Sequence, residues 1–184
     1  MLALLCPNLY VSSICQVDLS RLAAAGIKGI VFDIDNTVVH WGSRDVSGVV
    51  LKWLGDAKAQ GFRMCVLSNN LKRRVEDVSR TLGIPAARGF KPMKYAFRSA
   101  LGLLGTAPFE TAVIGDQLFT DVLGGNLAGL YTILVKPMSY TEFITTRVVR
   151  RLETVVLGYL MSRGMLVLEG EMQAKDRRHA AGAY

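Results

Sequence analysis

Two aspartates separated by one residue follow an apolar segment of the sequence. Asp33 and Asp35 come directly after Val31-Phe32, and an extended chain would direct both carboxylates to the same side. Carboxylates held that close repel each other and need a cation or a proton between them. A third acid, Asp116, follows another apolar segment. Three acids that converge on one point form an oxygen-rich site, so the sequence predicts a Mg²⁺ site built from these aspartates.

Two further groups suit a phosphoryl group beside such a metal. Ser68 ends an apolar segment and offers a hydroxyl donor, while Lys91, directly before Pro92, offers positive charge. Together with the acids they predict a phosphate site that contains a metal. Each also has a plainer interpretation, because Ser68 could cap the following helix and Lys91 could be a solvated surface residue.

The elements that must position these residues alternate along the chain. Short runs rich in Val, Ile and Leu predict buried strands over residues 27–32, 62–67, 111–114 and 131–135. Apolar residues at helical spacing predict helices over residues 46–60, 71–82, 93–104 and 118–128. The alternation predicts an α/β fold with a doubly wound parallel sheet. Ligands bind such sheets at the carboxyl ends of the strands, where Asp33, Ser68 and Asp116 fall.

Composition and charge restrict the classes of function. The chain has 184 residues, 51% of them hydrophobic, which excludes disorder over most of the length and suits a single domain over residues 1–168. Residues 169–184 are polar, small and basic, and are predicted to form a flexible tail. The net charge of +7 favours an anionic partner. Because the basic residues are spread along the chain, we expect no nucleic-acid partner.

The N-terminus and the cysteines indicate where the protein resides. No basic residue precedes Arg21, and Pro7 interrupts the apolar N-terminal stretch, which is untypical of a signal peptide. Cys6, Cys15 and Cys65 form neither a C-x-x-C pair nor a zinc spacing, and Cys65 lies in an apolar run typical of a core. These features suit a reducing compartment, so we expect a cytoplasmic protein.

The C-terminal segment over residues 140–165 has the pattern of a basic amphipathic helix. Its apolar residues recur at helical spacing and arginines are interspersed among them. Such a helix could pack on the sheet or on a partner subunit, which most apolar helical faces do, or lie on an anionic membrane. The predicted apolar face comprises Ile144, Val148, Leu152, Val155 or Val156, Tyr159 and Leu160.

Four segments, in order, resemble the motifs of the haloacid dehalogenase (HAD) superfamily. Residues 31–38 resemble the first motif, hydrophobic-D-x-D-x-T, and Val66-Leu67-Ser68-Asn69 resembles the second, a strand ending in Ser or Thr. Lys91-Pro92 resembles the third motif, and residues 115–121 resemble the fourth, GD-x4-D. The resemblance spans about residues 28–137 and implies a HAD-type Rossmannoid fold.

The resemblance implies a Mg²⁺-dependent phosphomonoester hydrolase. Asp33 would be the nucleophile that forms an aspartyl-phosphate, and Asp35 would be the acid and base. The Asp33 carboxylate, the Asp35 main-chain carbonyl and the Asp116 carboxylate would hold the metal. A further set of groups would bind the phosphate or orient water on the metal, namely Ser68, the main chain near Asn69, Lys91 and, for the water, Asp121.

The gaps between the motifs are short. Residues 37–62 and residues 70–91 each have room for only one helix, so no cap domain is expected and the site should be open. An open site suits a phosphate carried by something large, such as a lipid bilayer. The basic residues near the second and third motifs are expected to be solvated, with undetermined roles: Arg73, Arg74, Arg88 and Lys94.

A narrower resemblance points to the YqeG branch of HAD subfamily IIIA. It rests on Ser68-Asn69-Asn70, Lys91-Pro92-Met93 and residues 114–126. That branch is similar to phosphatidylglycerophosphate phosphatases, which implies removal of the terminal phosphate from the lipid head group of phosphatidylglycerophosphate to give phosphatidylglycerol. Together with the basic C-terminal helix, this leads us to expect peripheral contact with the inner face of the membrane. Two alternatives stay open: a HAD phosphatase of a phosphoprotein, a nucleic-acid end or a soluble phosphometabolite, and an inactive binding module on a HAD scaffold.

Overall fold

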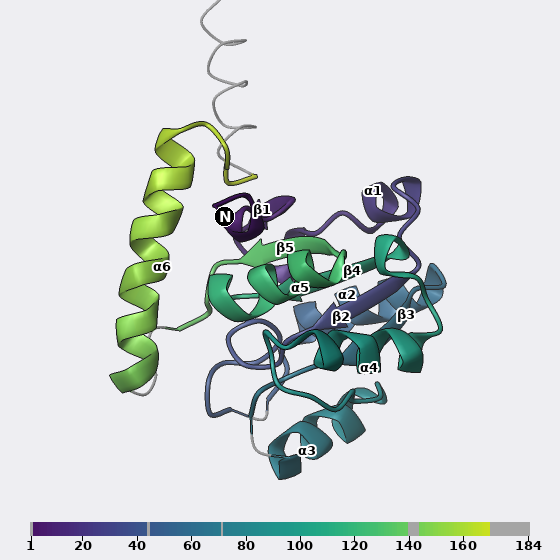
Figure 1. The fold of residues 1–184 in the computed structure, drawn as a ribbon. Helices are drawn as coiled ribbons and strands as arrows, with labels where there is room; N and C mark the ends of the chain where they lie inside the picture. Colours follow the sequence, from purple (N-terminus) through teal and green to yellow (C-terminus); the bar gives the residue numbers. More distant parts are fainter. Residues whose placement is uncertain (1, 44, 71, 140–143, 170–184) are drawn as a thin grey trace, which may run out of the picture.

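A single parallel sheet forms the centre of the computed structural model, which describes residues 2–43, 45–70, 72–139 and 144–169 (Figure 1). The strands are β1 (Leu9–Val11), β2 (Gly29–Phe32), β3 (Arg63–Val66), β4 (Thr111–Gly115) and β5 (Tyr131–Val135). Their order is β1-β5-β4-β2-β3, and every neighbouring pair is parallel. After β2 the chain forms β3 at one edge of the sheet, and it then crosses back to form β4 on the opposite side of β2. The carboxyl ends of β2 and β4 therefore form the switch point at which such sheets bind ligands.

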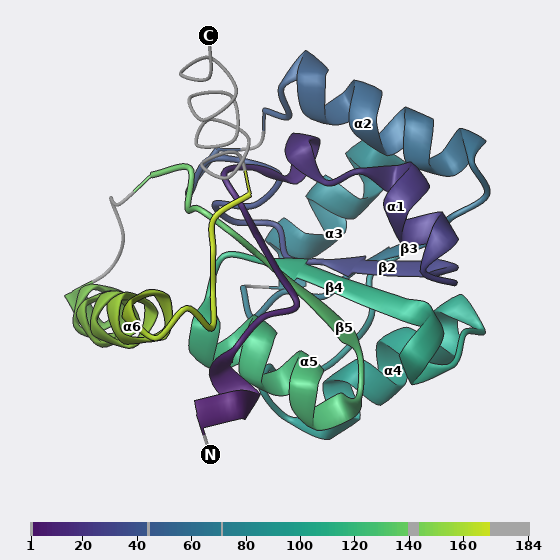
Figure 2. The ribbon, with the colours of Figure 1, turned by 90° about the horizontal axis from the view of Figure 1, so that it is seen from above.

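Helices cover both faces of the sheet (Figure 2). One face carries α1 (Leu19–Ala24), α2 (Gly48–Ala59) and α3 (Lys72–Leu82), and the other carries α4 (Lys94–Leu104) and α5 (Leu123–Ala128). Alternate strand residues serve the two faces, because Ile30 and Phe32 belong to the core under α1 to α3 while Val31 packs with α4. The predicted α/β fold with a doubly wound parallel sheet is confirmed.

The N-terminal segment contains two elements that the sequence pattern did not reveal. The strand β1 joins the edge of the sheet by pairing with β5, and Asn8 Oδ1 accepts a hydrogen bond of 2.8 Å from Thr132 N. Helix α1 begins after Asp18, whose carboxylate caps it by accepting from Ser20 N and Arg21 N. Both elements are too short for a periodic apolar pattern to develop.

The helix predicted over residues 118–128 is divided into a π-helical turn, η4 (Leu118–Val122), and α5. Two glycines let α5 pack closely against its neighbours, Gly124 against α4 and Gly125 against the sheet. A Cβ on Gly124 would lie 2.4 Å from Phe97 Cε2, and a Cβ on Gly125 would lie 2.4 Å from Val113 Cγ1. The close approach fixes the position of the turn that precedes α5.

The last helix, α6 (Ile144–Ser162), stands beside the sheet on the side toward which β5 points (Figure 1). After α6 the chain returns to the first strand, where Leu168 bridges Tyr10 and Glu169 N donates to Tyr10 O at 2.8 Å. The start of the predicted C-terminal helix, 140–143, and residues 170–184 of the predicted tail lie outside the described residues. None of the helices in the described ranges has the length and apolar content needed to cross a bilayer.

The face with which α6 packs differs from the apolar face predicted. Leu160 is fully buried, and Val156 and Leu157 are partly buried against the core of β1 and β5. Most of the predicted face instead points to solvent. We call these exposed residues the outer stripe: Val148, Leu152, Val155 and Tyr159, whose exposed fractions are 57%, 56%, 71% and 41%.

Candidate active site

Two of the predicted acids lie side by side because their strands are neighbours. Asp33 follows β2 and Asp116 follows β4, and Asp33 N continues the ladder by donating to Ile114 O at 2.9 Å. Both aspartates are buried. Register between β2 and β4 thus brings together two carboxylates that are far apart in the sequence.

A third carboxylate, Asp121, reaches the same point through the π-helical turn. Its Oδ2 accepts a hydrogen bond of 3.1 Å from Gln117 N, and its side chain lies against the main chain of Gly115. A Cβ on Gly115 would lie only 2.1 Å from Asp121 Cγ, so no other residue fits there. The turn thus folds Asp121, the last acid of the Gly-Asp-x4-Asp segment, back onto Gly115, its first residue. This contact explains the spacing of the segment.

Lys91 joins the acids to each other. Its Nζ lies 2.9 Å from Asp33 Oδ1 and 2.6 Å from Asp121 Oδ1, and the side chain is only 3% exposed. The Asn69 side chain holds the main chain of Lys91, because its Oδ1 accepts from Lys91 N at 2.7 Å and its Nδ2 donates to Lys91 O at 2.9 Å. Burial alone would lower the pKa of Lys91, but the charges of Asp121 and Asp33 raise it, so the ammonium stays charged.

The acid cluster of Asp33, Asp116 and Asp121 has the donor set that a divalent cation requires. One carboxylate oxygen from each aspartate lies within 4.8 Å of the others. Asp116 Oδ1 is buried and, within the described part of the chain, has no hydrogen-bond donor. Burial raises the pKa of both Asp33 and Asp116, which Lys91 and Arg150 partly oppose. A cation would satisfy the open oxygen and offset the cost of burying these charges, so the cluster fits Mg²⁺.

Asp35 lies outside this cluster and has partners of its own. Arg74 Nη2 and Nε lie 2.6 and 3.2 Å from Asp35 Oδ1, and Asn70 Nδ2 donates to Asp35 Oδ2 at 2.7 Å. Arg74 also donates to Ser43 O at 2.7 Å, and its side chain is only 15% exposed. The expectation that Arg74 is solvated is therefore wrong. Three neighbouring basic residues are exposed as expected: Arg73, Arg88 and Lys94.

Ser68 lies at the end of β3, next to a cavity of about 660 Å³. Its hydroxyl accepts a long hydrogen bond of 3.4 Å from Asn70 N. The cavity lies between α3 and the segment before Lys91, and its lining includes Ser79, Arg80 and Arg88. The structure thus brings Ser68 to the sheet edge that carries the acids and leaves it beside open, polar space.

Helix α6 contributes a residue that the sequence pattern did not identify. Arg150 forms an ion pair with the Asp116 carboxylate, and its Nη1 donates to Asp116 O at 2.6 Å. Glu153 secures this arrangement, because its Oε2 lies 3.1 Å from Arg150 Nη1 while its Oε1 accepts from Leu118 N and Phe119 N at 2.6 and 3.2 Å. In the sequence, Arg150 was one of several arginines on a basic helix, and its Arg-x-x-Glu spacing was the one signal available.

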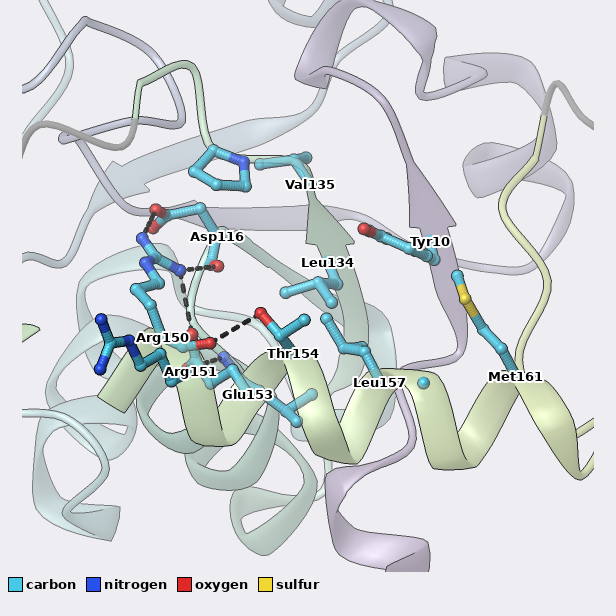
Figure 3. A pocket seen from close by; sticks show the side chains of 13 residues that line it. Tyr10, Asp116, Leu134, Val135, Arg150, Arg151, Glu153, Thr154, Leu157 and Met161 are labelled. Atoms are coloured by element: carbon cyan, nitrogen blue, oxygen red, sulfur yellow. Dashed lines mark hydrogen bonds and ion pairs between the residues drawn. The ribbon is translucent and has the colours of Figure 1, made fainter. Parts of the chain in front are cut away.

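A mainly apolar pocket of about 540 Å³ lies between β5 and α6 (Figure 3). Asp116 and Arg150 stand at one end, and Tyr10 and Met161 lie at the other. The pocket therefore opens onto a carboxylate of the acid cluster.

Known proteins resemble the chain over most of its length. Residues 90–146 match the HAD-hydrolase-like family model. The chain is 37% identical to the probable phosphatase YqeG of Bacillus subtilis, over 89% of its own length and 95% of that protein. It is 30% identical to the phosphatidylglycerophosphate phosphatase 1, chloroplastic/mitochondrial, of Arabidopsis thaliana, over 86% of this chain but only 49% of that protein.

A solved structure shows the same fold. A HAD family hydrolase from Streptomyces avermitilis superposes with a TM-score of 0.50 at 19% identity, over 68% of this chain and 74% of that one. The strand order, the site at the switch point and the close match to YqeG agree with one another. The chain therefore belongs to the HAD-like hydrolases and is a phosphatase of the YqeG branch.

Proposed function

We propose that this phosphatase converts phosphatidylglycerophosphate to phosphatidylglycerol in a Mg²⁺-dependent reaction that passes through an aspartyl-phosphate on Asp33. The observation that carries the chemistry is the bridge of Lys91 between Asp33 and Asp121, beside Asp116. A nucleophilic carboxylate needs a fixed position and neighbouring positive charge if it is to approach an anionic phosphate, and the bridge supplies both.

The chain's own residues divide the reaction into two steps. In the first step a bond forms between an Asp33 carboxylate oxygen and phosphorus, the ester P–O bond breaks, and Asp35 gives its proton to the leaving oxygen. In the second step water attacks phosphorus, Asp35 takes the water's proton, and the Asp33–phosphorus bond breaks. Lys91 neutralises phosphoryl charge and Ser68 donates a hydrogen bond to a phosphoryl oxygen.

The metal would be held by the Asp33 and Asp116 carboxylates and the Asp35 main-chain carbonyl, with Asp121 orienting its water. Bound Mg²⁺ would add the positive charge that stabilises the phosphoryl oxygens. Asn69 serves this site through its two hydrogen bonds to the Lys91 main chain.

Three features support a lipid substrate. The curated relative from Arabidopsis is a phosphatidylglycerophosphate phosphatase. The described residues between β2 and β3 and between β3 and Lys91 form one loop and one helix each, which leaves the site open to a large substrate. The outer stripe of α6 is flanked by exposed Arg151 and Arg163, and the Arg163 guanidinium lies 5.3 Å from the Tyr159 ring centre.

An apolar stripe flanked by arginines suits the surface of an anionic bilayer. We therefore propose peripheral contact with the inner face of the membrane through α6, which places the reaction on the cytoplasmic side. The three free cysteines suit that reducing compartment.

Phosphate release from phosphatidylglycerophosphate in mixed micelles, measured with and without Mg²⁺, tests the substrate. We expect a kcat/KM at least about a hundredfold above that for glycerol 3-phosphate, because binding energy away from the reacting group adds to transition-state stabilisation. Equal or faster turnover of soluble phosphate esters would refute the lipid assignment.

The chemistry is tested separately by trapping the phosphorylated enzyme after acid quench. Asp33→Asn should abolish both trapping and turnover, whereas Asp33 would lose its assigned role if that variant kept either one.

One observation favours a second candidate substrate. The cavity beside Ser68 is lined by polar and basic residues, among them Arg80 and Arg88, which would suit the leaving group of a soluble phosphometabolite. Such a substrate predicts that Arg88→Ala raises KM for the soluble ester and leaves turnover of the lipid unchanged.

A further inference from the structure

The pocket under α6 shares Asp116 with the proposed reaction site. Asp116 belongs both to the acid cluster and to the pocket lining, and Arg150 stands beside it (Figure 3). From Arg150 the pocket follows α6 as far as Met161, which is about 16 Å along the helix axis at the usual rise per residue. A molecule whose phosphate lies at Asp33 could therefore extend into this pocket.

The walls of the pocket are apolar away from that end. They include Leu134 and Val135 of β5 together with Leu157 and Met161 of α6. The charged groups at the inner end form ion pairs with one another, because Arg150 is paired with both Asp116 and Glu153. Apolar walls offer no partners for ordered water, so the pocket suits a hydrocarbon group.

We propose that this pocket binds one acyl chain of the lipid substrate while its phosphate lies at Asp33; this assignment rests on the proposed function. The volume of about 540 Å³ lies within the range usual for ligand sites. Exposed Arg151 lies at the rim and also flanks the outer stripe, so the rim and the proposed membrane contact share one side of the helix. One chain can thus enter from the bilayer while the other stays in it.

Binding of an acyl chain in this pocket predicts an effect on turnover that membrane contact alone does not. Lipids with one short chain stay monomeric in solution, so a gain in turnover with chain length reports binding to the protein and not adsorption to a surface. Each methylene group buried in the pocket should raise kcat/KM about fourfold until the pocket is filled. The probes are lysophosphatidylglycerophosphates with butanoyl, hexanoyl and octanoyl chains, compared with the chainless head group.

Gly158 gives a variant that narrows the pocket. It lines the pocket from α6, is exposed, and has no atom within 4 Å of an added Cβ, so a phenylalanine fits without a main-chain clash. In Gly158→Phe the octanoyl-to-head-group ratio of kcat/KM should fall at least tenfold. Thr154→Phe narrows the same pocket from the next turn. The matched control is Gly55→Phe, an exposed and equally open glycine in α2, which should keep the wild-type ratio.

A binding measurement separates this proposal from the proposed function. Octanoyl lipid should shift the methyl NMR signal of Met161, assigned with Met161→Leu, and Gly158→Phe should suppress the shift. Suppose that micellar phosphatidylglycerophosphate is hydrolysed but kcat/KM for the monomeric lipids does not rise with chain length. That result would refute acyl-chain binding in the pocket and leave the proposed function intact. A gain that survives in both narrowed variants would also overturn it. If the lipid shifts Met161 but no lipid phosphate is hydrolysed, the pocket holds and the proposed function fails.

Discussion

At the scale of single residues, the site depends on two basic side chains with different tasks. Lys91 is buried between Asp33 and Asp121, where it keeps two acids apart and compensates their charge. Arg74 lies outside the acid cluster and holds Asp35 together with Asn70. An acid and base that must serve two successive steps needs one fixed orientation, and Arg74 supplies it.

Arg74 is therefore predicted to be a positioning residue for Asp35. Arg74→Ala should lower kcat about ten- to a hundredfold with little change in KM, because a displaced acid and base slows both proton transfers. The phosphorylated enzyme should still form, at a reduced rate. Arg74→Lys should recover part of the activity, since one ammonium cannot replace a guanidinium that bonds Asp35 and Ser43 together.

The neighbouring Arg73 is exposed and gives the control. Arg73→Ala should leave kcat as in the wild type. A loss of the same size in both arginine variants would contradict a specific role for Arg74.

Cys65 gives a prediction about pH. Burial in the core raises the pKa of its thiol from 9.0 to about 12, so near neutral pH almost no reactive thiolate forms in the folded protein. Iodoacetamide should modify the partly buried Cys6 and Cys15 first, with Cys65 labelled only after unfolding in urea, as read by mass spectrometry. Because the unfolded chain releases this proton at lower pH, stability should also fall as pH rises from 9.0 toward 12. Native labelling of Cys65 as fast as Cys6 would contradict this picture.

At the scale of elements, η4 and α5 are the part of the fold most closely fitted to the site. Gly115 accepts the Asp121 side chain against its main chain, Gly124 lets α5 lie close to α4, and Gly125 lets it lie close to the sheet. The π-helical turn between them changes the helical phase and so brings Asp121 back to Lys91. The glycines therefore influence the position of Asp121 by setting how closely α5 packs against α4 and the sheet.

Gly124→Ala tests this close fit. The added methyl group would meet the fully buried Phe97 ring, so the free energy of unfolding should fall by about 1–3 kcal/mol. Gly102→Ala in α4 is the control, because nothing lies within 4 Å of its Cβ position and the change should stabilise the helix by about 0.5–1 kcal/mol. Urea denaturation measures both. A Gly124→Ala protein as stable as Gly102→Ala would mean that α5 can move away from α4 at no cost in stability.

The sequence predicted the elements whose signals are local. The strands β2 to β5 are continuous apolar runs, and the acids after β2 and β4 are recognisable from position alone. The strand β1 and helix α1 were not predicted because they are too short to show a periodic pattern of apolar residues. The roles of Arg74 and Arg150 were missed for another reason: the site carboxylates that they bind, Asp35 and Asp116, are 39 and 34 residues away in the sequence.

The packing of α6 shows the limit of apolar periodicity. The pattern identified the helix and its amphipathic character but left open whether the apolar face packs on the protein or faces outward, and most of that face is the outer stripe. The packed face includes Glu153, which is buried because it bonds two main-chain N–H groups of η4 and Arg150. A buried acid with three donors cannot be distinguished from a solvated acid by periodicity.

At the scale of the whole molecule, the exposed apolar surface of α6 lies on the same helix as Arg150. One helix therefore presents the outer stripe to solvent and an arginine to the acid cluster. This arrangement would hold the site at a fixed distance from any surface on which α6 rests.

Val155→Glu in the outer stripe should weaken binding to vesicles of phosphatidylglycerol and phosphatidylcholine about tenfold or more. The change removes an apolar contact and adds a charge that anionic lipids repel. The control is Val49→Glu, which changes a similarly exposed valine (67%) on α2, away from α6 (Figure 2). Co-sedimentation measures both, and equal binding of the two variants would exclude α6 as the contact surface.

The pairing of Arg150 with Asp116 has a consequence for the order in which ligands arrive. With every group ionised, the three aspartates of the acid cluster and Glu153 exceed Lys91 and Arg150 by two negative charges. In that state the site repels a phosphate dianion, whereas a divalent cation cancels the excess negative charge. Metal and phosphate should then bind cooperatively, and by linkage each must raise the affinity for the other by the same factor. Calorimetric titration of Mg²⁺ with and without inorganic phosphate would show this thermodynamic coupling directly.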